Sequence, residues 1–207
     1  MAYLVLVRHG QSEWNLLGQW TGLVDVELTG KGREEARAAA QALENLPLHA
    51  AHSSPLKRAK DTLQEILDEL GQAEIEAKAD PALNERDYGH LTGRNKWQVK
   101  QEHGEEQFAL WRRSWDYPIP GGETLKDVHA RVVPYYEQHI LSDLKAGKNV
   151  IVAAHGNTLR ALVKHLEGVT EAIIPGLEIG TGEVYLYEIG EDGKIIDKQI
   201  KVTGGKA

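Results

Sequence analysis

The sequence predicts an α/β fold in which a mainly parallel sheet is covered by helices on both faces. Two observations favour this class. Short apolar runs typical of buried strands alternate with longer segments in which apolar residues recur at helical spacing. No repeat, low-complexity stretch or linker interrupts the 207 residues, so we expect one domain spanning 1–207.

The first half of the chain is expected to hold three strands and two helices. The strands are predicted at 3–7, 49–53 and, more weakly, 74–77, and the helices at 29–46 and 55–70. Thr29 is a suitable N-cap for the first helix, because its hydroxyl can accept a hydrogen bond from a free backbone amide. Gly71 ends the second helix.

The second half begins with an irregular region, 80–122, that contains helical patches at 95–102 and 105–115. After it we expect a long helix at 124–144, a strand at 149–154, a helix at 158–166, and paired strands at 183–189 and 195–202. Pro134 should bend the long helix, because proline has no amide hydrogen to donate. The turn at Asp192-Gly193 should join the last two strands.

Composition excludes several classes of protein. The net charge of −7 argues against a general nucleic-acid-binding protein, which needs a basic face. The absence of cysteine rules out disulfides, thiolate metal sites and a cysteine nucleophile. No apolar segment is long enough to span a membrane, and the first apolar run is too short for a signal peptide. A cytoplasmic protein is therefore expected.

The most informative motif is Arg8-His9-Gly10-Gln11, which directly follows the first strand. The same arrangement recurs where the strand at 149–154 runs into His155-Gly156-Asn157. Open α/β sheets bind ligands at the carboxyl edge of their strands. Two histidines delivered to one edge therefore predict a functional site there.

Several cationic side chains are predicted to lie near these histidines in the fold. Arg58 lies in the first turn of a predicted helix that starts at the same edge, and a glycine-punctuated loop adds a carboxylate, a guanidinium and a phenol. The members of this set are Arg8, Arg58, Glu85, Arg86, Tyr88, Lys96, Arg112 and Arg113. Arginines that converge beside a histidine suit phosphoryl transfer, because they stabilise the charge on the transferred group. A neutral imidazole is a competent nucleophile at neutral pH.

The residues leave other interpretations open. A metal site formed by His9, His155 and Glu85 is one alternative, although Arg8 and Arg58 would repel the cation. The other histidines, at 49, 52, 90, 103, 129, 139 and 165, are interpreted as ordinary surface or core residues. Single arginines are usually solvated. Judged by the local sequence alone, Glu85, Lys96, Arg112 and Arg113 fit a ligand-binding site and an ordinary solvated position equally well. No Gly-Lys-Ser/Thr follows either histidine, so neither segment is a P-loop.

The run from Leu6 to Asn15 (LVRHGQSEWN) resembles the signature of the histidine phosphatase superfamily. Further segments resemble one branch, the cofactor-dependent phosphoglycerate mutases. These segments are 21–22, 25–26, 28–29, 54–58, 83–89, 91–93, 95–96, 111–114, 123–127 and 154–160. The resemblance covers nearly the whole chain and implies interconversion of 3-phosphoglycerate and 2-phosphoglycerate, an isomerisation in glycolysis and gluconeogenesis.

The resemblance also implies a role for each matching residue. His9 would be the phosphorylated nucleophile, His155 its partner, and Glu85 the general acid and base, while Arg8 and Arg58 would clamp the transferring group. Substrate would be held by Ser12, Asn15, Thr21, Gly22, Arg86, Tyr88, Lys96, Arg112, Arg113, Gly156 and Asn157. The implied cofactor is 2,3-bisphosphoglycerate, which primes the enzyme without a metal. The implied partners are small phosphoglycerates, with no nucleic acid and no membrane, and a homodimer or homotetramer is left open.

The chain departs from the longer members of that family. Segment 116–122 leads directly to Glu123 without their insertion, the tail after Val202 is short, and Leu23 replaces a common aromatic residue. These departures affect how the site closes, the oligomeric state and the balance between mutase and phosphatase activity. A phosphatase of the same fold that hydrolyses phosphate monoesters is the main rival function. A non-catalytic binding protein is the third, disfavoured because every expected catalytic residue is present.

Overall fold

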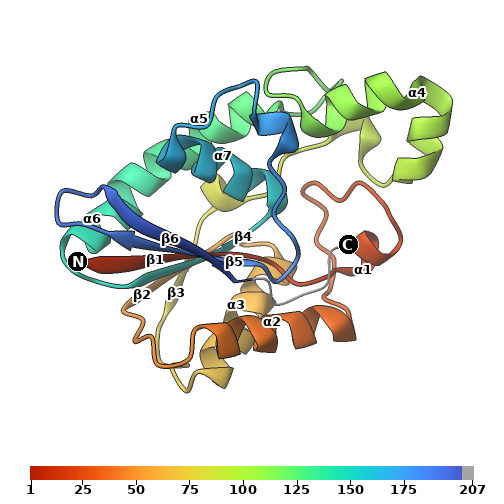
Figure 1. Cartoon of the computed structure of the whole chain (residues 1–207). Helices are drawn as coiled ribbons and strands as arrows, with labels where there is room; N and C mark the ends of the chain where they lie inside the picture. The colour runs from red at the N-terminus through yellow and green to blue at the C-terminus, as the bar shows by residue number, and fades with distance from the viewer. Residues whose placement is uncertain (202–207) are drawn as a thin grey trace.

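The computed structural model describes residues 1–201 and shows a sheet between two layers of helices (Figure 1). Within these residues the sheet has six strands in the order β3-β2-β4-β1-β5-β6. The strands are β1 (Ala2–Arg8), β2 (Ala50–Ser53), β3 (Ala77–Ala79), β4 (Val150–Ala154), β5 (Val184–Ile189) and β6 (Ile195–Lys201). The first four in chain order are parallel, whereas β5 runs antiparallel to β1 and β6 antiparallel to β5. The predicted mainly parallel sheet is confirmed.

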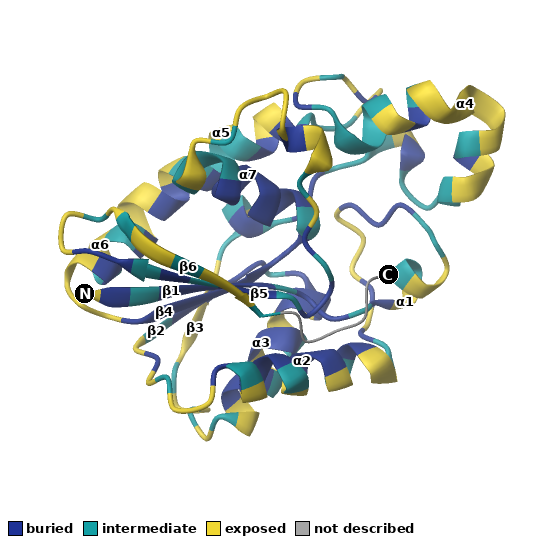
Figure 2. Ribbon diagram, in the orientation of Figure 1, coloured by how far each residue is buried: buried dark blue, intermediate teal, exposed yellow. Residues whose placement is uncertain are grey.

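The α-helices within residues 1–201 are α1 (Glu13–Leu16), α2 (Gly30–Ala42), α3 (Lys57–Glu69), α4 (Lys96–Arg113), α5 (Leu125–Tyr135), α6 (Leu141–Lys145) and α7 (Gly156–Glu167). Short turns of tighter helix lie at η1 (Pro81–Leu83), η2 (Gly89–Leu91) and η4 (Ile174–Gly176). Helices α2 and α3 pack on one face, and α5, α6 and α7 on the other (Figure 2). No helix within residues 1–201 has the length and apolarity needed to cross a membrane.

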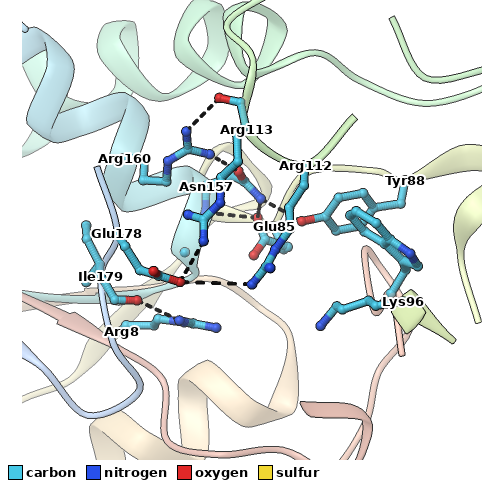
Figure 3. A pocket seen from close by; sticks show the side chains of 12 residues that line it. Arg8, Glu85, Tyr88, Lys96, Arg112, Arg113, Asn157, Arg160, Glu178 and Ile179 are labelled. Carbon is cyan, nitrogen blue, oxygen red and sulfur yellow. Dashed lines mark hydrogen bonds and ion pairs between the residues drawn. The ribbon is translucent and has the colours of Figure 1, made fainter. Parts of the chain in front are cut away.

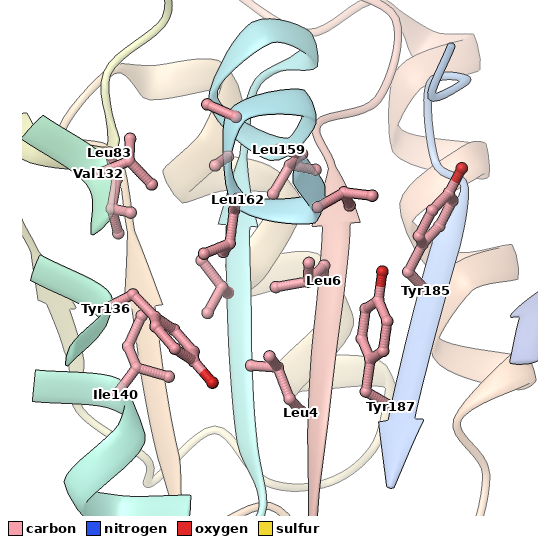
Figure 4. Packing of buried hydrophobic residues seen from close by; sticks show 14 of the residues in the cluster. Leu4, Leu6, Leu83, Val132, Tyr136, Ile140, Leu159, Leu162, Tyr185 and Tyr187 are labelled. Atoms are coloured by element: carbon pink, nitrogen blue, oxygen red, sulfur yellow. The ribbon is translucent and has the colours of Figure 1, made fainter. Parts of the chain in front are cut away.

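The alternation of side chains along β1 divides the core in two. Leu4 and Leu6 point to the face covered by α5 and α7, where Tyr187 and Leu162 join them (Figure 4). Val5 and Val7 point to the opposite face, where they pack with residues of α2 and α3. Because both faces are buried, β1 and β4 read as continuous apolar runs.

Several predicted elements shift by a few residues. The weak strand predicted at 74–77 is wrong: β3 lies at 77–79, because the chain from Gly71 (φ 66°) to Ile75 forms turns before Ala77 pairs with Ala51. Thr29 caps α2 as predicted, and its hydroxyl accepts a hydrogen bond from the Gly32 amide. That helix ends at Ala42 rather than 46. Helix α3 begins at Lys57 rather than 55.

The predicted long helix is present but interrupted. After Pro134 the chain widens into a π-helical segment, η3 (Tyr136–Ile140), before α6 continues it. The two helical patches predicted in the irregular region form α4, which changes direction at Gly104 (φ 84°, ψ 164°). Helix α1 was not predicted. The turn at Asp192-Gly193 joins β5 to β6, and Val202, predicted to end β6, lies outside the described residues.

Candidate active site

The carboxyl ends of β1 and β4 bring the two predicted histidines together. Arg8 pairs with Ala154 in the parallel register, and the His9 amide donates to the Ala154 carbonyl at 3.0 Å. The two next residues, His9 and His155, consequently face each other. Their ring centroids lie 5.0 Å apart with an interplanar angle of 62°, and both side chains are buried.

The surroundings of His9 keep its imidazole neutral. Burial, followed by the positive charges of Arg58 and Arg8, lowers its pKa well below the usual value. Its Nδ1 lies 2.7 Å from the Gly10 carbonyl oxygen. Because a carbonyl only accepts, Nδ1 carries the hydrogen, and Nε2 presents a lone pair. This nitrogen could act as a nucleophile.

His155 is the N-cap of α7, which begins at Gly156, two residues before the helix start predicted at 158. Burial and the charges of Arg58, His9 and Arg8 lower its pKa well below the usual value. Neither ring nitrogen has a hydrogen-bond partner within residues 1–201. Buried polar atoms are almost always satisfied, so an unpaired imidazole here is suited to a ligand group.

Two arginines flank the histidines, and each is held by backbone carbonyls. Arg58, on α3, is buried and donates to the carbonyls of Gly22 at 2.8 Å and Val24 at 2.9 Å. Burial lowers its pKa to about 10, so it remains charged at neutral pH. Arg8 donates to the Ile179 carbonyl at 2.6 Å. The Nε atoms of both side chains are unpaired within the described residues.

Glu85 lies in the same pocket, with one carboxylate oxygen already occupied. Its Oε1 accepts from the Arg86 amide at 2.7 Å, the Asn157 amide at 3.3 Å and Asn157 Nδ2 at 3.1 Å. Within residues 1–201 no donor pairs with Oε2, which lies on the side of Gly156. The carboxylate is therefore oriented by three donors while one oxygen stays open to a ligand.

The loop that carries Glu85 is supported by Arg131, a residue that sequence reasoning missed. Its guanidinium donates to the carbonyls of Ala82, Asn84 and Glu85 at 2.8 to 3.0 Å, and it pairs with Glu123 at 2.9 Å. An arginine in the middle of an amphipathic helix gives no signal in a single sequence. Only the fold reveals that it holds a loop.

Farther out, α4 contributes three cations to the pocket (Figure 3). Lys96 comes from its start, and Arg112 and Arg113 from its last turn. Burial, followed by the charges of Arg112 and Arg8, lowers the pKa of Lys96 to about 8. The bend at Gly104 lets both ends of one helix reach the same pocket. The structure thus gathers every cation predicted for the site except Arg86.

The remaining predicted residues divide into two groups. Asn15 and Thr21 line the pocket beside His9, while Tyr88, Gly156 and Asn157 line its outer part. Arg86, Ser12 and Gly22 instead lie behind this lining in structural positions.

Arg86 is fully buried and lines neither part of the pocket. Its guanidinium stacks on the Tyr88 ring at 4.7 Å and donates to the Trp111 carbonyl. Ser12 caps α1, and Gly22 supplies a carbonyl to Arg58. These three residues therefore support the site without facing a ligand.

Five residues line the pocket that the sequence analysis did not assign: Gln19, Trp20, Arg160, Glu178 and Ile179. Arg160 follows His155 by little more than one helical turn, and that spacing was the available signal. Glu178 and Ile179 precede the antiparallel strand β5, where no motif marked them.

Within residues 1–201 no three acidic or histidine side chains are grouped so that they could hold a metal ion.

Comparison with known proteins gives a consistent result. Residues 4–200 match the model of the histidine phosphatase superfamily (branch 1). A 2,3-bisphosphoglycerate-dependent phosphoglycerate mutase of Brucella anthropi is 49% identical over 199 residues, which cover 95% of this chain and 97% of that protein. The protein of the same name from Beijerinckia indica is 49% identical over 203 residues, covering 97% and 98%.

Solved structures with this fold include a mycobacterial glucosyl-3-phosphoglycerate phosphatase in complex with VO3. It superposes with a TM-score of 0.83 at 27% identity and covers 98% of each chain. A protein described as mycobacterial hydrolase 1 gives the same TM-score at 26% identity, covering 100% of this chain and 99% of the other.

Proposed function

The chain belongs to the histidine phosphatase superfamily, and on that premise we propose that it is a 2,3-bisphosphoglycerate-dependent phosphoglycerate mutase. It interconverts 3-phosphoglycerate and 2-phosphoglycerate through a phosphohistidine. The observation that carries the proposal is the buried, neutral pair His9 and His155, with Arg8, Arg58 and Glu85 lining the pocket beside His9. Relatives of this name at about half sequence identity over nearly the full length support it.

Phosphoryl transfer starts at His9. Its Nε2 lone pair attacks phosphorus, so that an N–P bond forms while the bond from phosphorus to the substrate oxygen breaks and leaves its electron pair on that oxygen. Glu85, through Oε2, gives a proton to this leaving oxygen. In the return direction a substrate hydroxyl oxygen attacks the phosphorus of phospho-His9 while Glu85 takes its proton; the O–P bond forms as the N–P bond breaks and returns its electron pair to Nε2. One carboxyl group thus serves as acid and then as base.

The charge that develops on the transferring group is stabilised by fixed donors. The Nε atoms of Arg8 and Arg58 and an N–H of His155 are unpaired, and they would donate to its oxygens. Because carbonyls already hold the two guanidiniums, little reorganisation is needed at the moment of transfer. His155 contributes as a neutral donor rather than as a second cation.

The cations of α4, which form the outer cluster of the pocket, would bind the part of the cofactor that does not face His9. When bound, 2,3-bisphosphoglycerate supplies the phosphoryl group that first loads His9. Arg8 and Arg58 would hold the phosphoryl group beside His9, and Lys96, Arg112 and Arg113 the other anionic groups. A mutase must keep a doubly phosphorylated glycerate while it turns round, and this outer cluster supplies the needed retention.

A phosphatase acting on phosphate monoesters is the second candidate, supported by the structural likeness to the glucosyl-3-phosphoglycerate phosphatase. Such an enzyme must admit water to phospho-His9 and release its product at once. The outer cluster of Lys96, Arg112 and Arg113 favours retention instead, and so favours the mutase.

A paired assay tests this proposal. The protein is given 3-phosphoglycerate, with and without 2,3-bisphosphoglycerate, and both 2-phosphoglycerate and inorganic phosphate are measured. Isomerisation should be much faster than phosphate release, and the bisphosphate should stimulate it, while a chelator changes neither rate. Phosphate release equal to or faster than isomerisation would make the phosphatase the correct function.

Two further expectations accompany this function. A glycolytic enzyme acts on cytoplasmic metabolites, which supports a cytoplasmic location. Assembly into a homodimer or homotetramer also stays a prediction, and the mass of the protein in solution would test it.

A further inference from the structure

A carboxylate occupies the cationic outer part of the pocket. Glu178 Oε1 lies 2.8 Å from Arg113 Nη2 and 3.9 Å from Arg112 Nη2. The Glu178 side chain is 62% exposed, so it reaches the arginines from the solvent side of the pocket. Figure 3 shows it between these arginines and Arg8. The two guanidiniums expected to hold substrate are thus already paired with an anion of the protein.

The position of Glu178 is fixed by its neighbour in the chain. The Ile179 carbonyl accepts from Arg8 at 2.6 Å, so the segment between η4 and β5 contacts the inner and outer cations at once. Glu178 is ionised at neutral pH: burial raises its pKa, but the hydrogen bond from Arg113 and the charges of Arg113 and Arg112 outweigh this and lower it.

This ion pair is not needed to hold α4 in place. The end of α4 is tied to α7 independently, because Arg160 donates to the Arg113 carbonyl at 3.0 Å. An exposed ion pair also contributes little to stability. The ion pair instead affects the binding of an incoming anion. That anion must displace the Glu178 carboxylate from the arginines, and it is then bound close to the same negative charge.

From this juxtaposition we propose that Glu178 is an internal competing anion that sets how tightly the site holds the second anionic group of its substrate. The inference rests on the proposed function. Without Glu178 the cluster of Lys96, Arg112 and Arg113 would bind a bisphosphate more tightly than turnover tolerates, because that ligand must turn round and its product must leave. Glu178 offsets part of this attraction and speeds exchange.

The test removes the charge and leaves the shape. Glu178→Gln should bind 2,3-bisphosphoglycerate roughly three- to tenfold more tightly, since a full like charge a few ångströms from the ligand is lost. The gain should shrink in high salt, because the Debye length falls to about 3 Å at 1 M. Glu191→Gln removes the same charge from the exposed turn after β5, at the opposite edge of the sheet, and should bind as the parent does.

Binding is measured by titration calorimetry with both substitutions placed in a His9→Ala background, so that no phosphoryl transfer occurs during the titration. Affinity equal to or weaker than that of His9→Ala alone would overturn the inference, because Glu178 would then only position Arg113. An equal gain in Glu191→Gln would also overturn it, since net charge alone would be the cause.

Steady-state kinetics in the otherwise natural chain give a second readout. Glu178→Gln should lower KM and kcat together, and should lower the fraction of turnovers that end in hydrolysis. A lower kcat with an unchanged or higher KM would contradict the inference. The proposed function fails separately, if the unaltered protein does not interconvert the two phosphoglycerates, and the calorimetric result does not depend on that outcome.

Discussion

Arg160 Nη1 donates a hydrogen bond to Asn157 Oδ1 at 2.8 Å, and this contact fixes which way the Asn157 amide points. A guanidinium can only donate, so it must face the amide oxygen. Asn157 Nδ2 is thereby turned toward Glu85 Oε1 at 3.1 Å and the Tyr88 hydroxyl at 2.8 Å. Arg160 thus orients Asn157, which in turn contacts the proposed acid-base group Glu85, so we expect Arg160 to act as a positioning residue.

Replacing Arg160 by methionine should consequently impair turnover more than binding. Arg160→Met frees the Asn157 amide to rotate, and misplacing a catalytic group costs on the order of 10²-fold in kcat. It also leaves the Arg113 carbonyl unpaired, while the Ile174 carbonyl keeps the hydrogen bond from the Leu177 amide; the loss should cost about 1 to 3 kcal/mol in urea unfolding. Arg37→Met, on the exposed face of α2, is the control. A kcat of Arg160→Met within threefold of the parent would contradict the positioning role of Arg160.

His9 should carry the phosphoryl group during turnover. Incubation with labelled 2,3-bisphosphoglycerate should give a protein adduct that is labile in acid and stable in base, because its bond is N–P. His9→Ala should abolish the adduct. Its matched control, the exposed His90→Ala, should leave it unchanged. Normal turnover in His9→Ala, or an acid-stable adduct on serine, would contradict the role of His9.

Glu85→Gln keeps the size of the side chain but removes the proton that the leaving oxygen needs. The expected loss in kcat is on the order of 10²- to 10⁴-fold. Phosphorylation of His9 by the bisphosphate should slow by a similar factor, as measured in a single turnover. Folding should change little, because the Asn157 and Arg86 donors still find the amide oxygen. A loss below about threefold would place the acid-base role elsewhere.

Much of the fold was predictable because its signals are local. The buried strands β1 and β4 show as apolar runs, and α2 as a capped periodic segment. The edge strand β3 was misplaced, since its residues are exposed and only pairing with β2 fixes its register. The predicted start of helix α7 lies two residues too far along the chain, because Gly156 and Asn157 have low helix propensity. Their place at the sheet edge decides the conformation instead.

The site was predictable where a residue stands directly at a strand end, as His9 and His155 do. Residues that act through tertiary contacts gave no such signal. Arg131 and Glu178 each reach the site across more than 40 residues of sequence, and their partners are known only from the fold. Arg86 is the converse case, since a cation that the sequence places in a loop of the site is buried against Tyr88.

The pair Arg112 and Arg113 should decide between isomerisation and hydrolysis. Replacing both by alanine weakens the outer clamp, so a doubly phosphorylated ligand escapes and water reaches phospho-His9. Mutase activity should fall, while the fraction of turnovers that release phosphate should rise. Arg33 and Arg37, replaced together on α2, control for the loss of two charges. An unchanged fraction would mean that the pair only decorates α4.

Acid should destabilise the protein partly through His52, which is fully buried and pairs through Nδ1 with the Tyr135 hydroxyl at 2.8 Å. Burial, followed by the charge of Lys78, lowers its pKa from 6.5 to about 4. Between these values the unfolded chain binds a proton that the folded chain excludes, so the free energy of unfolding falls as the pH drops below about 6.5.

This contribution of His52 is constant above pH 6.5 and should amount to a loss of about 2 kcal/mol at pH 5. His52→Asn keeps a polar atom near the position of Nδ1 but cannot titrate. Urea unfolding at pH 5 and pH 7.5 should therefore show a smaller pH-dependent loss in this variant than in the parent. His9, His155 and His129, whose pKa values are lowered in the same direction, contribute to the remaining loss. If His52→Asn loses as much stability as the parent over this interval, His52 is not excluding a proton. The exposed His90→Asn should match the parent in either case.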